Sequence, residues 1–173
     1  MIANLLTASR LLLIPVIIWL IITEQSTWAF IVFGLAALTD LFDGAIARRR
    51  NEVTELGRIL DPLTDRLFIS SIVIALWLRG GVAPPLWALL ILLARDAIVL
   101  VGSAWLTWLG RPIEVTMFGK AATTVLLVAI LFMVGNMEFG LWLFYGGLIL
   151  YVGSGFNYFA RGKKIWESSH ETI

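Results

Sequence analysis

Six long apolar stretches, separated by short polar connections, constrain this chain more than any other feature of its sequence. A helix that crosses the hydrocarbon core of a bilayer needs roughly 20 mostly apolar residues. The stretches cover Leu5–Ile22, Trp28–Ala47, Pro62–Leu78, Leu86–Trp108, Phe118–Val134 and Phe139–Phe159. The chain is 60% hydrophobic and 14% charged, whereas soluble domains carry about 25% charged residues. We therefore expect an all-α, polytopic integral membrane protein, a six-transmembrane-helix bundle that forms a single domain over residues 1–173.

Lysine and arginine gather at alternate ends of these stretches. They lie near the N-terminus, in the second and fourth connections and after the last stretch, as Arg10, Arg48, Arg49, Arg50, Arg58, Arg66, Arg111, Lys120, Arg161, Lys163 and Lys164. The other connections hold only Arg79, and Arg95 falls inside a stretch. Because cytoplasmic loops collect Lys and Arg, both termini are predicted to face the cytoplasm. We expect the protein to lie in a bacterial-type cytoplasmic membrane.

Composition narrows the possible partners and cofactors. The chain has no cysteine, which excludes disulfides and thiolate metal sites. Its net charge of +1 argues against a nucleic-acid partner. The apolar N-terminus, Leu11 to Ile22, lacks a convincing small-residue cleavage site, so we expect a retained span and not a removed signal peptide.

Five aspartates lie in or beside the apolar stretches, namely Asp40, Asp43, Asp61, Asp65 and Asp96. An aspartate at the centre of a membrane costs about 2.5 to 3.5 kcal/mol on insertion scales, so such residues are rare and usually functional. The structural alternative is a salt bridge in which Arg95 or Arg66 neutralises one of them. Two pairs of aspartates exceed what a single salt bridge explains, and this favours a functional site.

The spacing of the first four aspartates predicts a metal site. Asp40 and Asp43 are three residues apart and Asp61 and Asp65 four apart, so each pair shares one face of its helix. A short connection would bring the two helices together, and converging carboxylates need cations between them. Oxygen ligands without His or Cys select Mg²⁺ or Mn²⁺, and two such ions commonly clamp a phosphate during displacement. Asp40 precedes Arg48 by about 12 Å of helix, which predicts a site near the cytoplasmic surface.

The same aspartates belong to a longer motif. The sequence from Asp40 reads DLFDGAIARRRNEVTELGRILDPLTD and follows D-x2-D-G-x2-A-R-x8-G-x3-D-x3-D. This pattern resembles the signature of the class I CDP-alcohol phosphatidyltransferase family, with a match at every fixed position. The resemblance implies phospholipid biosynthesis by transfer of a phosphatidyl group from CDP-diacylglycerol to an alcohol, with release of CMP. It also implies a homodimer.

Site roles follow from that resemblance. Asp40, Asp43, Asp61 and Asp65 correspond to metal ligands, and Asp65 also to the general base. The positions that correspond to donor-binding residues, which bind the CDP-linked lipid, are Gly44, Ala47, Arg48 and Gly57. Glycine permits a nucleotide to approach the helix backbone, and an arginine can pair with phosphate. The alternative for the glycines is ordinary small-residue helix packing, which is also expected of Gly146, Gly147, Gly153 and Gly155.

The acceptor alcohol is less constrained. Candidate contacts are Arg95, Asp96, Arg111 and Lys120, although Arg95 could instead pair with an aspartate and Lys120 could extend to the membrane interface. The stretches LGRILDPLTDRLF, ARDAIVLVGSAWLTWLG and FGKAAT look most like the cardiolipin synthase branch, which implies phosphatidylglycerol. Phosphatidylglycerophosphate synthases, which use glycerol-3-phosphate, are also similar. They typically carry Arg-Glu and another arginine eight residues after the first, where this chain has Ser103.

Two other classes of membrane protein place acidic residues in apolar spans. A small cation transporter would not need Gly44, Ala47, Arg48 and Gly57 at fixed spacings, and no inverted repeat is apparent. A UbiA-like prenyltransferase would need a longer chain with its aspartate motifs far apart. The tail from Arg161 to Ile173, which contains His170, is expected to form an interfacial helix or a frayed end without chemistry.

Overall fold

The computed structural model describes the backbone of residues 2–50, 55–108 and 117–168. Its side chains are described for residues 12–39, 64–106 and 117–155. Six helices account for nearly all of this backbone. They are α1 Ile2–Ile22, α2 Ser26–Arg50, α3 Glu55–Arg79, α4 Leu86–Trp108, α5 Met117–Val134 and α6 Glu138–Ser168.

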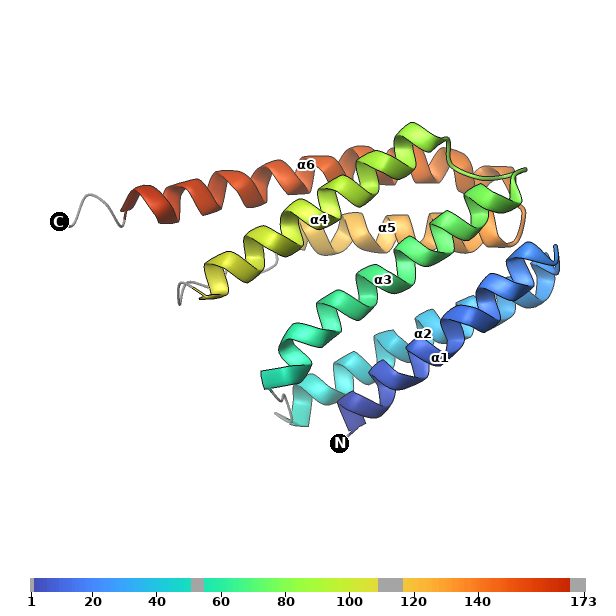
Figure 1. The fold of residues 1–173 in the computed structure, drawn as a ribbon, viewed down its shortest axis with the longest axis horizontal. Coiled ribbons are helices and arrows are strands. Elements are labelled where there is room, and N and C mark those ends of the chain that lie inside the picture. The colour runs from blue at the N-terminus through green and yellow to red at the C-terminus, as the bar shows by residue number, and fades with distance from the viewer. Residues whose placement is uncertain (1, 51–54, 109–116, 169–173) are drawn as a thin grey trace.

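The helices run in alternating directions, so that α1 begins and α6 ends at the same end of the bundle (Figure 1). The last turn of α2 and the first turn of α3 lie there as well, and we call it the motif end because these two helices carry the aspartate motif. The all-helical class and the six helices are confirmed. Helix α6 continues without a break to Ser168, nine residues past the last apolar stretch, which agrees with the helical alternative for the polar tail after Arg161.

The outer surface of the bundle is apolar. Large apolar side chains are exposed on every described helix, and Leu12, Trp142 and Ile149 each expose more than 70% of their surface. Within the described residues, Leu86–Leu106 and Met117–Val134 are long and apolar enough to cross a membrane, and Leu12–Ile22 and Ser26–Thr39 are shorter apolar helices. An apolar exterior suits lipid as the surrounding solvent, while six complete spans stay a prediction.

Helices α5 and α6 pack closely because glycine removes side chains between them. A Cβ atom added at Gly140 would lie 2.6 Å from the backbone nitrogen of Met133, and one at Gly147 would lie 3.1 Å from Leu126. Gly146 has no atom within 4 Å of such a Cβ, so close packing there was predicted wrongly. Periodicity along α6 did not reveal which of two consecutive glycines faces α5.

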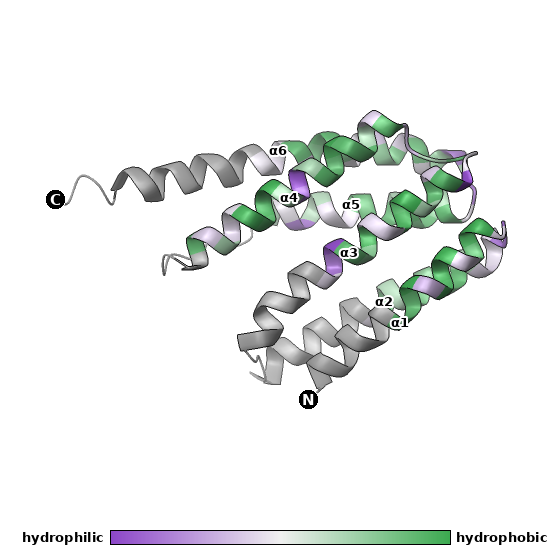
Figure 2. Ribbon diagram, viewed as in Figure 1, coloured by the Kyte–Doolittle hydropathy of each residue, from purple (hydrophilic) through white to green (hydrophobic). Residues whose placement is uncertain are grey.

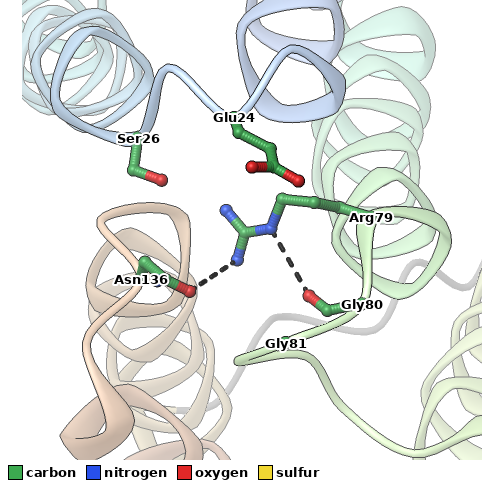
Figure 3. A pocket seen from close by; sticks show the side chains of 6 residues that line it. All are labelled: Glu24, Ser26, Arg79, Gly80, Gly81 and Asn136. Carbon is green, nitrogen blue, oxygen red and sulfur yellow. Dashed lines mark hydrogen bonds between the residues drawn. The ribbon is translucent and has the colours of Figure 1, made fainter.

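Arg79 ties three loops together at the end of the bundle opposite the motif end (Figure 3). Its guanidinium donates hydrogen bonds to the carbonyl oxygens of Met133 at 3.2 Å and Val82 at 3.3 Å, and to the Asn136 side chain at 3.4 Å. A cation is favourable beside the carbonyls that end a helix, as at the end of α5. The recess of about 220 Å³ around Arg79 is lined by Glu24, Ser26, Gly80, Gly81 and Asn136. Because the Arg79 guanidinium already donates its hydrogen bonds to backbone carbonyl oxygens, we interpret this recess as part of the packing between loops and not as a binding site.

Candidate active site

The two halves of the aspartate motif lie on consecutive helices. Asp40 and Asp43 are in the last half of α2, and Asp61 and Asp65 are in the first half of α3. The rings of Phe33 and Phe68 stack between these helices, with centroids 5.5 Å apart and planes 5° apart. This ring contact joins α2 to α3, while both helices pack more extensively against α1 in the described part of the structure.

The side chains of most motif residues lie outside the described part of the structure. These are Asp40, Asp43, Gly44, Ala47, Arg48, Gly57 and Asp61. The side chain of Asp65 is described and is partly buried. Among the side chains that are described, no three His, Cys, Asp or Glu residues lie close enough to hold a metal ion. Of the four predicted metal ligands, only Asp65 has a described side chain.

Next to Asp65 begins a cluster of charged side chains from three helices, which we call the arginine cluster: Arg66 of α3, Arg95 and Asp96 of α4, and Tyr151 and Ser154 of α6. Nη1 of Arg66 forms an ion pair with Oδ1 of Asp96 and donates a hydrogen bond to the Tyr151 hydroxyl at 2.9 Å. The Tyr151 hydroxyl in turn donates to the same Asp96 oxygen. A single carboxylate oxygen thus links α3, α4 and α6.

Arg95 packs against α6. Its guanidinium carbon lies 3.8 Å from the centre of the Tyr151 ring, which is a cation–π contact. Nη2 of Arg95 donates to Ser154 Oγ at 2.9 Å, and Nη1 lies 3.3 Å from Asp96 Oδ1. Its buried Nε finds no hydrogen-bond partner in the described part of the chain. These contacts fix the Arg95 side chain and leave it 12% exposed.

The arginine cluster carries a net positive charge, since two guanidinium groups share one carboxylate. Arg66 is its most exposed charged member, with 25% of its side chain accessible, compared with 9% for Asp96. Figure 2 shows hydrophilic positions part-way along α3 and α4, and the one on α4 lies between hydrophobic stretches. A charge that is only partly neutralised in such surroundings is weakly screened and attracts an anion strongly.

The predicted acceptor residues do not all come together. Arg95 pairs with Asp96, which was one of the alternatives, and Arg66 neutralises Asp96, so the structural alternative holds for this aspartate. Lys120 is exposed near the start of α5 and is not among the contacts of the cluster. The Ser103 hydroxyl donates to the Leu100 carbonyl of its own helix at 3.0 Å. Arg111 lies outside the described residues.

Sequence reasoning missed Tyr151 and Ser154. Both are polar residues three positions apart in an otherwise apolar stretch, and this spacing is the only signal that they share a face of α6. Tyrosine is also common at membrane interfaces, so its presence alone did not indicate a buried contact.

An all-helical bundle with many apolar side chains on its described surface, and with ionised groups gathered part-way along its helices, defines a membrane-type protein. The description "CDP-alcohol phosphatidyltransferase" belongs to the family model that matches residues 1–154, which include the whole motif and the arginine cluster. The chain belongs to this family, as the motif predicted.

Curated relatives agree with this assignment. The chain is 41% identical over 135 residues to the cardiolipin synthase (CMP-forming) of Streptomyces coelicolor, covering 74% of this chain and 62% of that protein. It is 37% identical over 123 residues to a putative cardiolipin synthase of Mycobacterium tuberculosis, covering 69% and 57%. With the CDP-diacylglycerol–glycerol-3-phosphate 3-phosphatidyltransferase of Escherichia coli it shares 32% identity over 158 residues, covering 87% and 84%. The chain thus spans about three fifths of the length of the two cardiolipin synthases.

Proposed function

We propose that this protein transfers a phosphatidyl group from CDP-diacylglycerol to a glycerol-type alcohol and releases CMP. The observation that carries the proposal is the complete aspartate motif, divided between two consecutive helices of a chain that matches the family over residues 1–154. Helices α2 and α3 supply one pair of aspartates each. The proposed site lies at the motif end of the single domain, open to the cytoplasm.

The donor set fits divalent metal ions. Asp40, Asp43, Asp61 and Asp65 are all oxygen donors, and the helical backbone that carries each pair is continuous. Carboxylates of this kind suit Mg²⁺ or Mn²⁺, and four of them suit two ions. When bound, the ions would neutralise the diphosphate of the donor and stabilise the charge of departing CMP.

The remaining motif residues are proposed to hold the donor. Gly44, Ala47 and Gly57 have little or no side chain, so the nucleotide can approach α2 and α3 closely. Arg48, in the last turn of α2, can pair with a phosphate oxygen. With the motif end on the cytoplasmic side, as proposed, this cation would lie toward the water-soluble nucleotide of the donor.

Asp65 is proposed as the general base. An alcohol is a weak nucleophile, so a carboxylate within hydrogen-bond reach accelerates the reaction by taking its proton. The acceptor oxygen then forms a bond to the phosphorus that carries diacylglycerol. The bond between this phosphorus and the bridging oxygen of the diphosphate breaks, and CMP leaves with that electron pair.

Phosphatidylglycerol is the acceptor that we favour, which would make cardiolipin. The arginine cluster has one positive charge in excess, which matches the single negative charge of a phosphodiester. Ser103, turned back to its own helix, adds no cation for the second charge of a phosphomonoester. Similarity to the Streptomyces protein supports this choice. Glycerol-3-phosphate is the second candidate, because the Escherichia coli relative matches most of this chain and Lys120 is exposed to a water-borne substrate.

Six membrane spans, cytoplasmic termini and a homodimer complete the proposal. The alternating helices place the start of α1 and the end of α6 together at the motif end (Figure 1). The basic residues of the second connection lie at that end as well. Because basic residues are more frequent in cytoplasmic loops, we propose that the motif end lies on the cytoplasmic side of the membrane.

The acceptor is tested with purified protein, CDP-diacylglycerol, and phosphatidylglycerol and glycerol-3-phosphate at equal concentration. Mass spectrometry then identifies the lipid product. We expect cardiolipin to predominate. Predominant phosphatidylglycerophosphate would contradict the choice of acceptor and leave phosphatidyl transfer standing. A transporter or a prenyltransferase would form neither product.

A further inference from the structure

Tyr151 is the one residue of the arginine cluster that contacts all three of its charged groups. Its hydroxyl accepts a hydrogen bond from Arg66 at 2.9 Å and donates one to Asp96, while its ring lies under the guanidinium of Arg95. Tyr151 is 5% exposed, so these contacts are shielded from water. No motif residue lies on α6, and the aspartate motif alone gives this helix no role in the reaction.

The hydroxyl and the ring of Tyr151 act on different arginines. A hydroxyl can accept from a cation and donate to an anion at once, so it bridges Arg66 and Asp96 and fixes their geometry. The ring face attracts Arg95 and keeps it on the α6 side of the cluster. The two guanidinium groups, which repel each other, thus share one oxygen of Asp96 while different parts of Tyr151 hold them.

Ser154 reinforces this arrangement. Its hydroxyl accepts from Arg95 Nη2 at 2.9 Å and donates to the backbone carbonyl of Tyr151 at 2.7 Å. Arg95 is thus held by the ring, by Ser154 and by Asp96, and little of it is accessible. Arg66 is more exposed, and it directly follows Asp65 in α3. Of the two arginines, Arg66 is therefore the one able to meet a ligand near Asp65.

We propose that Arg66 binds the anionic group of the acceptor and that Tyr151 is the positioning residue that fixes Arg66 for this purpose. Arg66 directly follows Asp65 in α3, and 25% of its side chain stays accessible while the Tyr151 hydroxyl and Asp96 hold it. An acceptor phosphate on Arg66 then brings its glycerol hydroxyl toward the base. This inference rests on the proposed function, because it requires an anionic alcohol as acceptor, and it makes α6 part of the acceptor site.

Tyr151→Phe tests the proposal, because it keeps the ring and removes only the hydroxyl. Tyr145→Phe is the matched control: Tyr145 lies on the same helix, its ring stacks on Trp87 at 5.9 Å, and the described structure gives its hydroxyl no hydrogen bond. The KM for acceptor and for CDP-diacylglycerol is measured in mixed micelles of defined lipid fraction. Tyr151→Phe should raise the acceptor KM about tenfold, the scale of one hydrogen bond to a charged group, and leave the donor KM unchanged. Tyr145→Phe should change neither.

A double-mutant cycle separates positioning from general stability. Arg66→Lys should also raise the acceptor KM, because an ammonium does not reproduce the guanidinium geometry. If Tyr151 acts through Arg66, the double variant should be no worse than Arg66→Lys alone. Additive effects, an equal rise in donor KM, or an unchanged acceptor KM would each overturn the proposal. Should Tyr151→Phe not fold, Arg66→Lys alone must still show the selective rise in acceptor KM.

The wild-type product distinguishes the two levels of inference. If the wild type uses only glycerol-3-phosphate, the choice of phosphatidylglycerol is wrong, and the acceptor KM of Tyr151→Phe still decides the role of Tyr151. If the wild type forms cardiolipin and Tyr151→Phe behaves as Tyr145→Phe does, the proposed function holds and the positioning role falls. A wild type that uses neither acceptor would overturn both.

Discussion

Asp65 and Arg66 occupy consecutive positions in α3, yet they were predictable to very different degrees. Asp65 was identified because it is four residues from Asp61 and closes a motif of fixed spacing. Arg66 was counted among the basic residues of a connection and named as a possible salt-bridge partner, but the sequence did not indicate that Asp96 of α4 is the aspartate with which it pairs. Local spacing indicates which residues share a helix face. It does not indicate which of five other helices that face meets, so Tyr151 and Ser154 could not be predicted.

Asp65→Asn should lower the turnover number by about 100-fold or more, the usual scale for loss of a general base. The amide cannot take the proton of the acceptor alcohol, while it still resembles the carboxylate in shape. Binding of CDP-diacylglycerol should remain largely intact. Asp40→Asn and Asp61→Asn serve as comparisons, since these should weaken metal and donor binding instead. Near-normal turnover of Asp65→Asn would show that another group is the base.

Removal of divalent metal should abolish activity, and Mg²⁺ or Mn²⁺ should restore it. Four aspartates without a nitrogen or sulfur ligand suit only such hard cations. Product formation is measured after dialysis against EDTA and again after adding back each ion. Calcium provides a control, since it prefers a larger coordination sphere. Full turnover in the chelator would contradict a metal-dependent reaction.

Gly44→Leu should abolish nucleotide binding without unfolding the protein. The residue lies in helical backbone near the end of α2, where leucine is a good helix former and fills the space proposed for the donor. Binding of CDP-diacylglycerol and thermal unfolding are measured on the same detergent-solubilised sample. Wild-type affinity in a folded variant would show that Gly44 serves only helix packing.

At the scale of elements, the positions of the six helices were predicted well, because each follows a long apolar stretch. For the tail after Arg161 the sequence left a helix and a frayed end open, and helical backbone continues through Arg161, Lys163 and Lys164 to Ser168. Helix formation depends on backbone hydrogen bonds and propensity as well as on hydrophobicity. Packing between elements was predicted least well, as the difference between Gly146 and Gly147 shows.

Gly140→Ala should destabilise the protein by about 1 to 3 kcal/mol, because its added methyl group would overpack the contact between α5 and α6. The methyl would lie 2.6 Å from the Met133 nitrogen and 2.9 Å from the Ala129 carbonyl oxygen, and neither backbone atom can easily move. Gly146→Ala is the matched control on the same helix, with open space around the added methyl. It should be neutral or slightly stabilising. Equal unfolding temperatures for the two variants would contradict the described packing.

At the scale of the whole molecule, the two ends of the bundle differ in chemistry. The motif end carries the aspartates and most of the basic residues, and at the opposite end Arg79 joins loops through carbonyl oxygens. About 20 Å of helix separates Asp65 from Arg79 along α3. One end is therefore suited to binding charged substrates and the other to holding helix pairs together. The spacing of charged residues predicted the chemistry of the motif end. The contacts of Arg79 at the opposite end lie between loops, and no sequence motif indicates them.

The central claim is that the two motif helices form a site for phosphatidyl transfer to an alcohol. Its most direct test is the release of CMP by purified protein given CDP-diacylglycerol, measured with and without phosphatidylglycerol and compared with Asp61→Asn. We predict that wild-type protein releases CMP only when the alcohol is present, in a one-to-one ratio with the new phospholipid. Asp61→Asn should release almost none. Release of CMP without an alcohol, or equal release by the variant, would contradict the claim.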